Sequence, residues 1–212
     1  MHIDQQWRHV GVERRAVADL LDGLSDDQWH APSLCSRWEV ADVAAHLAML
    51  PRPPSVRELV VRGLRARGSF HRLNEQAAKD FARHGRTQLV SWIREDADSR
   101  RIPAVTNAEN VLFDLLVHTQ DIAVPLGIEH VPDRTATAAA ADRVWTMGWP
   151  FRARRRLRGL RLVADDVKWS VGAGEEVSGS VLSLLLLLTG RNAALPELHG
   201  PGTDRLATVL RS

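Results

Sequence analysis

Residues 106–126 read TNAENVLFDLLVHTQDIAVPL. This stretch is long enough for a helix of several turns, and Thr106 and Glu109 have the Ser/Thr-x-x-Glu spacing of a capping box at its start. The same spacing occurs at Ser36–Glu39 and Ser55–Glu58, each ahead of a stretch compatible with a helix. Repeated helix starts of this kind predict a bundle of helices.

Three further stretches before residue 150 are also predicted to be helical. A first helix is expected at about Asp4–Leu21, where apolar side chains recur at helical spacing. Gly85 followed by Thr87 indicates that one helix ends and another begins. The Pro-Asp pair at 132–133 is typical of a helix start, and that helix is expected to run to about Trp149.

The sequence pattern changes after residue 150. LRLVADDVKWSVG, residues 160–172, has short alternating runs around a turn and predicts a β-hairpin. Val181–Thr189 predicts a helix that ends at Gly190, and Asp204–Leu210 could form a strand or a short helix. We therefore expect a mainly α protein, with a helical bundle in residues 1–150 and a small α+β domain in residues 151–212.

Composition excludes several classes of protein. The 212 residues are 44% apolar and 25% charged, as in ordinary globular proteins, and the net charge of +2 does not indicate a polycation for nucleic acid. A single cysteine excludes an internal disulfide framework and fits a reducing compartment. The charged N-terminus has no signal-peptide core, and the longest apolar run is too short to span a membrane. We expect a cytoplasmic protein without a membrane partner.

Asp114 and His118 are the first candidates for chemistry. They are four residues apart and therefore lie on one face of the predicted helix, next to apolar positions such as Leu115. Burying a carboxylate is costly unless it is paired or bound to a metal. A carboxylate and an imidazole at this spacing can both bind one zinc ion, but they can also simply hydrogen-bond to each other. The spacing leaves both interpretations open.

His46 lies on the helix expected after Ser36, at the border of its apolar stripe. It could be a metal ligand, with Asp42 one turn earlier to orient its ring, or an ordinary hydrogen-bonded core histidine. Two histidines and one carboxylate from two helices would leave coordination positions open, as catalytic rather than structural metal sites do.

Other conspicuous residues are predicted to have structural roles. Six arginines lie within residues 152–161, but without interleaved aromatics they favour a solvated surface, an anion-facing loop or an interface over nucleic-acid binding. Trp29 and Trp38 are expected to pack at the start of the second helix. Cys35 is interpreted as a packed or partly exposed free thiol, because no activating base is identifiable beside it.

Three stretches resemble a known family. Residues 29–47, WHAPSLCSRWEVADVAAHL, are similar to the N-terminal signature of the mycothiol-dependent maleylpyruvate isomerase family, and residues 113–127, FDLLVHTQDIAVPLG, to its second metal-binding helix. The tail, with VKWSVG at 167–172 and LLLTGR at 186–191, resembles its small C-terminal domain. The resemblance implies a DinB-like four-helix bundle followed by a small α+β domain.

The resemblance also implies a site. His46, Asp114 and His118 correspond to the three protein ligands of a divalent metal, usually zinc, and mycothiol or a similar thiol is the implied cofactor. Many relatives have glutamate in place of Asp114, and the shorter aspartate would hold the metal nearer its helix. Arg191 is the candidate for binding an anionic substrate, although an arginine after a helix can equally complement the helix dipole.

The implied reaction is an isomerisation or an S-transfer. A metal-bound thiol loses its proton, and the thiolate either adds to a cis double bond and leaves after rotation, or attacks an electrophile and stays attached. Two alternatives remain: a non-catalytic DinB-like metal-binding or regulatory module, and a metal-assisted hydrolase that needs no thiol. Helical bundles of this kind are also compatible with a homodimer.

Overall fold

The computed structural model describes residues 1–52, 70–103 and 106–211 of the chain. The chain divides into two compact units, His2–His130 and Val131–Ser212. The capping box expected at Ser55–Glu58 lies outside the described residues. Among the residues that are described, no helix combines the length and the apolar character needed to cross a bilayer.

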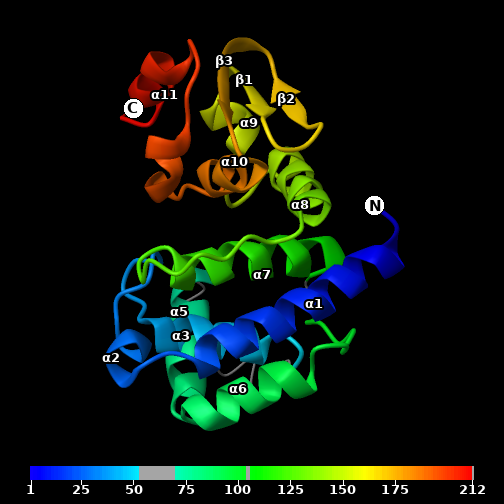
Figure 1. Cartoon of the computed structure of the whole chain (residues 1–212), viewed down its shortest axis with the longest axis vertical. Coiled ribbons are helices and arrows are strands. Elements are labelled where there is room, and N and C mark those ends of the chain that lie inside the picture. The colour runs from blue at the N-terminus through cyan, green and yellow to red at the C-terminus, as the bar shows by residue number, and fades with distance from the viewer. Residues whose placement is uncertain (53–69, 104–105, 212) are drawn as a thin grey trace. The chain divides into compact units, whose positions relative to one another are not determined.

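The first unit is helical, as predicted. Its helices are α1 (Ile3–Asp22), α2 (Asp26–Trp29), α3 (Val40–Met49), α5 (Phe70–Ala82), α6 (Arg86–Glu95) and α7 (Ala108–Ala123). Helix α1 packs against α6 and α7, and α3 packs against α5, α6 and α7. Figure 1 shows α1 between α6 and α7. The described part of this unit is therefore the expected DinB-like bundle, in which α3 and α7 are neighbours.

Two helices begin later than their capping boxes predict. Helix α3 begins at Val40 rather than directly after Ser36, because Arg37 has a φ of +69° and interrupts the helical path. The Glu39 backbone N–H instead donates to Asp42 Oδ2 over 3.1 Å. Helix α7 is capped by Asn107, not Thr106, since the Asn107 side chain accepts from the backbone N–H of Asn110.

The second unit contains α8 (Arg134–Thr146), α9 (Ala153–Arg156), β1 (Gly159–Ala164), β2 (Ser170–Gly172), β3 (Gly174–Gly179), α10 (Val181–Leu188), the 3-10 helix η1 (Asn192–Glu197) and α11 (Thr203–Val209). The division at residues 130–131 lies before the boundary expected at 150–151. The reason is that α8, which the sequence places with the bundle, packs extensively against α10.

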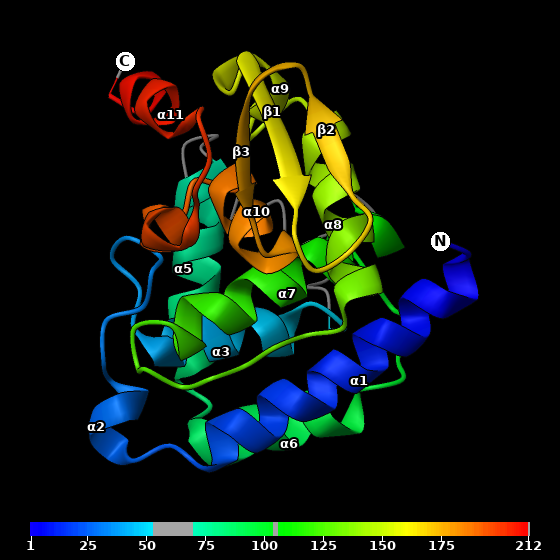
Figure 2. The same cartoon turned by 45° about the horizontal axis from the view of Figure 1, so that its top comes forward.

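The sheet of this unit has the order β2-β1-β3, with β1 in the middle (Figure 2). The predicted hairpin is confirmed, because β1 and β2 are antiparallel. Strand β3 runs parallel to β1 on its other side and was not predicted. The chain reaches it by crossing close to β1, where Gly174 has a φ of +129° and an added Cβ would lie 2.0 Å from the Gly159 carbonyl oxygen.

Helix α10 forms the apolar centre of the second unit. Its sequence VLSLLLLL is buried at seven of eight positions. The Arg156 guanidinium donates to the carbonyl oxygens of Leu187 and Leu188, over 2.6 and 3.1 Å, at the C-terminal end of α10. These bonds satisfy carbonyls that have no partner within the helix. The C-terminal segment, for which strand and helix were both open, is the helix α11.

Candidate metal centre

The carboxylate of Asp114 lies between two imidazoles. Asp114 Oδ2 is 3.0 Å from His46 Nε2, and Asp114 Oδ1 is 3.5 Å from His118 Nε2. One ligand atom from each of the three residues lies within 4.8 Å of the other two. His46 comes from α3, whereas Asp114 and His118 come from successive turns of α7. The structure therefore brings together the three side chains that the sequence singled out.

The packing of α3 against α7 explains why these side chains meet. Both helices bury apolar residues around the site, among them Val43, Leu47 and Leu115. The side chains of His46 and His118 are only 8% and 13% exposed, whereas Asp114 is 26% exposed. The cluster thus lies at the edge of the core, where its polar atoms are largely removed from water but can still be reached from outside. The shorter aspartate side chain spans to both histidines.

The charges in the cluster are strongly coupled. Burial alone would raise the pKa of Asp114, but the attraction of His118 and His46 and their hydrogen bonds hold the pKa of this carboxyl well below its usual range. Burial alone would lower the pKa of His118, yet Asp114 and the hydrogen bonds with Asp121 and Cys35 raise that pKa well above its usual value. Both shifts favour the charged forms, an ionised carboxylate beside a protonated imidazole.

Trp38 packs against both histidines. Its ring centroid is 5.5 Å from that of His46 and 6.2 Å from that of His118, and its plane is inclined by 19° to the His118 ring. The two imidazoles are 4.8 Å apart, edge to face. Trp38 was expected to pack at the start of the second helix, and it does so against the two site histidines. That contact was not foreseen.

Two more side chains adjoin the site: Asp121, for which no role was predicted, and Cys35, which is a half-buried thiol outside any disulfide, as the sequence predicted. Asp121, one turn after His118 on α7, accepts a hydrogen bond at Oδ2 from His118 Nδ1 over 2.8 Å. Cys35 Sγ lies 3.0 Å from the same Oδ2 and 3.6 Å from His118 Nδ1. The expectation that Cys35 has no base beside it is therefore wrong, because loop 33–38 folds back onto α7. The i,i+3 spacing of His118 and Asp121 was a usable signal.

Asp42 does not orient His46 as expected. Its Oδ2 accepts from the Glu39 backbone at the start of α3, and burial raises its pKa. The buried Nδ1 of His46 has no hydrogen-bond partner among the described residues. The two histidines thus differ: both present Nε2 to Asp114, but only His118 is hydrogen-bonded at Nδ1.

Arg191 belongs to the second unit, apart from the three clustered residues in sequence and in unit. It follows α10, and its Nη1 donates to the carbonyl oxygen of Thr189 over 3.0 Å. Its backbone N–H donates to the carbonyl oxygen of Leu186. These bonds match the alternative role considered for it, an arginine at the C-terminal end of a helix.

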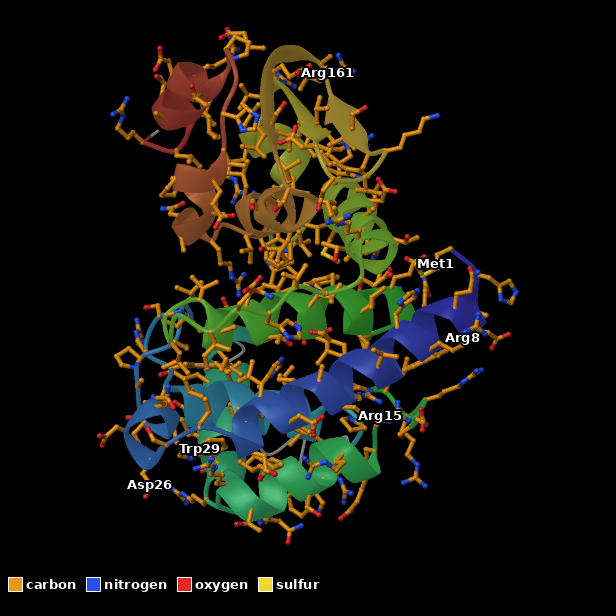
Figure 3. All side chains as sticks on the ribbon, in the orientation of Figure 1. Met1, Arg8, Arg15, Asp26, Trp29 and Arg161 are labelled. Atoms are coloured by element: carbon orange, nitrogen blue, oxygen red, sulfur yellow. The ribbon has the colours of Figure 1, made fainter. Side chains whose placement is uncertain are left out.

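The arginine-rich segment has several different environments. Arg156 is half-buried against α10, Arg154 lies over the Trp145 ring at 5.8 Å, and Arg161 is 3.5 Å from Glu176. Figure 3 shows Arg161 within the second unit. These three arginines therefore have partners within their own unit.

Comparisons with solved structures agree with this fold. The crystal structure of a histidine-to-alanine mutant of mycothiol-dependent maleylpyruvate isomerase aligns over 96% of this chain and 94% of that chain, with a TM-score of 0.51 and 14% sequence identity. A crystal structure of mycothiol-dependent maleylpyruvate isomerase aligns over the same shares with a TM-score of 0.48 and 14% identity. At such low identity the first likeness shows a shared fold.

Sequence comparison finds a similarity in the N-terminal half of the chain. No curated protein matches the chain at a significant level. Residues 10–106 match the family model of the mycothiol maleylpyruvate isomerase N-terminal domain. The matched range includes His46 and ends before Asp114 and His118. Residues 10–106 of this chain are therefore similar to the mycothiol maleylpyruvate isomerase N-terminal domain.

Proposed function

We propose that this protein is a metal-dependent enzyme that uses a low-molecular-weight thiol, such as mycothiol, as an isomerase or S-transferase acting on a small, anionic electrophile. The observation that carries the proposal is the position of the Asp114 carboxylate between the Nε2 atoms of His46 and His118. A largely buried carboxylate between two imidazoles is a costly arrangement at the edge of a bundle core unless it has a function.

The three side chains fit a divalent metal such as zinc. Two imidazole nitrogens and one carboxylate oxygen are a common donor set of catalytic zinc sites. Bonds of about 2.0–2.2 Å in a tetrahedral arrangement separate neighbouring donor atoms by roughly 3.3–3.6 Å. The separations of 3.0 Å from His46 Nε2 to Asp114 Oδ2 and 3.5 Å from His118 Nε2 to Asp114 Oδ1 are close to this range.

The chemistry of such a site depends on its open positions. A divalent metal held by three protein ligands supplies a positive charge that lowers the pKa of a coordinated thiol, so that a thiolate is present at neutral pH. His46, Asp114 and His118 would bind and orient the metal ion. Trp38 covers one side of both imidazoles and limits the access of water to them.

Arg191 is our candidate for binding the anionic group of the substrate. A guanidinium is a permanent cation with five N–H donors in a planar fork, which suits it to a carboxylate or a similar anionic group. Arg191→Gln should lower kcat/KM for an anionic electrophile about 10-fold or more, because it removes a charge-assisted contact, and should leave the metal content unchanged. An unchanged kcat/KM would leave Arg191 as a residue that only caps α10.

The metal site is tested by elemental analysis of purified protein. Wild type is expected to hold close to one divalent metal per chain, and His118→Ala very little. His130→Ala is the matched control, because His130 is also largely buried and hydrogen-bonded to a carboxylate, Glu13, over 2.7 Å. It should keep its metal. Equal metal in wild type and His118→Ala would refute the site.

Thiol dependence separates the proposed enzyme from its alternatives. The metal-loaded protein should consume an anionic electrophile, such as a cis-unsaturated dicarboxylate, only when a low-molecular-weight thiol is added. Hydrolytic turnover without thiol would instead identify a metal-assisted hydrolase. Metal binding with neither thiol binding nor turnover would identify a non-catalytic module.

A further inference from the structure

We infer that Asp121, supported by Cys35, is a positioning residue that fixes the ring of His118 and directs its Nε2 atom toward Asp114 and His46. This inference rests on the proposed function, since it concerns how a ligand of the proposed metal is held. It adds Asp121 and Cys35 to the residues on which metal binding depends.

One oxygen of the Asp121 side chain lies within hydrogen-bond distance of two other side chains. The Asp121 side chain is completely buried, and its Oδ2 lies 2.8 Å from His118 Nδ1 and 3.0 Å from Cys35 Sγ. The Cys35 thiol donates to this oxygen, and the same oxygen lies where it can accept a hydrogen bond from His118 Nδ1. With Nδ1 directed at Asp121, Nε2 is the nitrogen left for a metal.

The two nitrogens of the His118 ring face different carboxylates. His118 Nε2 is the atom that lies 3.5 Å from Asp114 Oδ1, on the opposite side of the ring from Asp121. Asp114, His118 and Asp121 are spaced i, i+4 and i+7, so they follow one another along one face of α7. The imidazole is thus held at both nitrogens by the same helix, and its rotation is restricted before any ligand binds.

Cys35 and its neighbour Leu34 attach the loop before α3 to Asp121. The Leu34 backbone N–H donates to the Asp121 carbonyl oxygen over 3.0 Å, and the Cys35 thiol reaches the Asp121 carboxylate. Asp121 therefore joins α7 to the loop that leads to Trp38. Because Trp38 packs on both site histidines, this attachment also holds the indole in place.

His46 and His118 differ in the hydrogen bonding of their Nδ1 atoms. The buried Nδ1 of His46 has no hydrogen-bond partner among the described residues, whereas that of His118 is bonded to a buried carboxylate. Hydrogen-bonded partners of metal-bound histidines typically change metal affinity about 10- to 100-fold when they are removed. We expect this contribution at His118.

The test is metal affinity, measured by competition with a chromophoric zinc chelator. Asp121→Asn keeps the size of the side chain and should weaken zinc binding about 10- to 100-fold. Cys35→Ala should weaken it less, and Cys35→Ser, which retains a donor, should restore it. Glu13→Gln is the matched control: it alters another buried carboxylate–imidazole pair of the same unit and should leave zinc affinity unchanged.

A second measurement needs no variant. In the zinc-loaded wild type, long-range ¹H–¹⁵N correlation spectra should show His118 protonated at Nδ1 and coordinated through Nε2. A proton on Nε2 would overturn the inference, and so would Asp121→Asn binding zinc within about twofold of wild type, well below the range for such partners. Two metals per wild-type chain and one in Cys35→Ala would also overturn it, because Cys35, His118 and Asp121 would then form a site of their own.

These outcomes are separable from failure of the proposed function. If wild type binds no metal, the proposed function itself fails. If wild type binds one zinc and His118→Ala does not, while Asp121→Asn binds as wild type does, the metal site stands and only the positioning role is lost.

Discussion

Two groups of buried or half-buried polar side chains, one in each unit, are bonded in different ways. At the C-terminal end of α10 in the second unit, the polar side chains bond to backbone: Arg156 donates to the carbonyls of Leu187 and Leu188, and the Thr189 hydroxyl to those of Leu185 and Leu186. In the helical unit, His46, Asp114, His118, Asp121 and Cys35 bond to one another through their side chains.

This difference distinguishes structural from functional burial. A side chain that satisfies the end of a helix repairs a defect that every helix has. Side chains that converge from two helices repair no backbone defect, and apolar residues would fill their space at lower cost. The polar cluster between α3 and α7 therefore requires another explanation, and a metal site supplies one.

The largest expected effect comes from removing the charge at the centre of the cluster. Asp114→Asn should weaken zinc binding by more than about 100-fold, because it removes a ligand rather than a partner of one. It should also lower the pKa of His118, since Asp114 is the group that most raises it. Chelator competition measures the first effect, and an NMR titration of the metal-free protein measures the second.

Asp114→Glu is the matched variant. It keeps the carboxylate that many relatives have, so it should retain zinc and the raised pKa of His118. If Asp114→Asn bound zinc as well as Asp114→Glu does, the cluster would be a hydrogen-bonded core element like the groups around α10, and the contrast between the units would disappear.

A strong pH dependence of zinc affinity should follow from the raised pKa of His118. Below that pKa, binding must displace one proton from His118, so affinity should rise up to about tenfold for each pH unit. Calorimetry in buffers of different ionisation enthalpy should detect about one proton released per zinc at neutral pH. Zinc affinity that does not change between pH 6 and pH 8 would contradict this account.

Above neutral pH, the stability of the metal-free protein should fall as the pH rises, whereas zinc affinity should rise. His118 has a raised folded-state pKa, so its contribution is complete below about 6.5 and is lost as pH rises through that pKa. Asp114 has a lowered folded-state pKa, so its contribution to stability is present above about pH 3.8. That contribution is lost as the pH falls through the folded-state pKa. The difference in unfolding free energy between wild type and His118→Gln should therefore be largest between about pH 4 and 6.5.

A smaller effect, on stability alone, is expected in the second unit. Arg156→Met should reduce the free energy of unfolding by about 1–3 kcal/mol, because the Leu187 and Leu188 carbonyls at the end of α10 lose the guanidinium donor. Leu187 keeps the bond from the Gly190 backbone N–H. Denaturant unfolding measures this change, and zinc affinity should stay constant. Arg155→Met, at an exposed position of the same short helix α9, is the control and should change stability little. Zinc affinity that falls in Arg156→Met would show that this arginine is not purely structural.

Local sequence signals predicted much of the fold. Helices α1 and α10 and the β1–β2 hairpin follow from apolar spacing, a terminal glycine and turn residues, which act over a few positions. The pairing of β3 with β1 was missed because it depends on a chain crossing that local pattern does not encode. Capping boxes misplaced two helix starts, since Arg37 and Asn107 adopt backbone conformations that the Ser/Thr-x-x-Glu spacing does not specify.

The residues of the candidate site were predictable one helix at a time. The i,i+4 spacing of Asp114 and His118 indicated their common face, and His46 was a candidate from its place beside the apolar stripe of its own helix. The family resemblance then indicated that the three bind one metal. Cys35 was misjudged because its neighbour Asp121 is 86 positions away in sequence and reaches it only after the loop docks on α7. Contacts of this kind arise from tertiary packing, which a single sequence does not reveal.

Anomalous diffraction at the zinc absorption edge, from crystals grown with zinc, tests whether His46, Asp114 and His118 together bind one metal ion. The account predicts one strong peak about 2.0–2.2 Å from His46 Nε2, an Asp114 carboxylate oxygen and His118 Nε2. A peak elsewhere, or none at this cluster while the Asp114–imidazole hydrogen bonds persist, would contradict it.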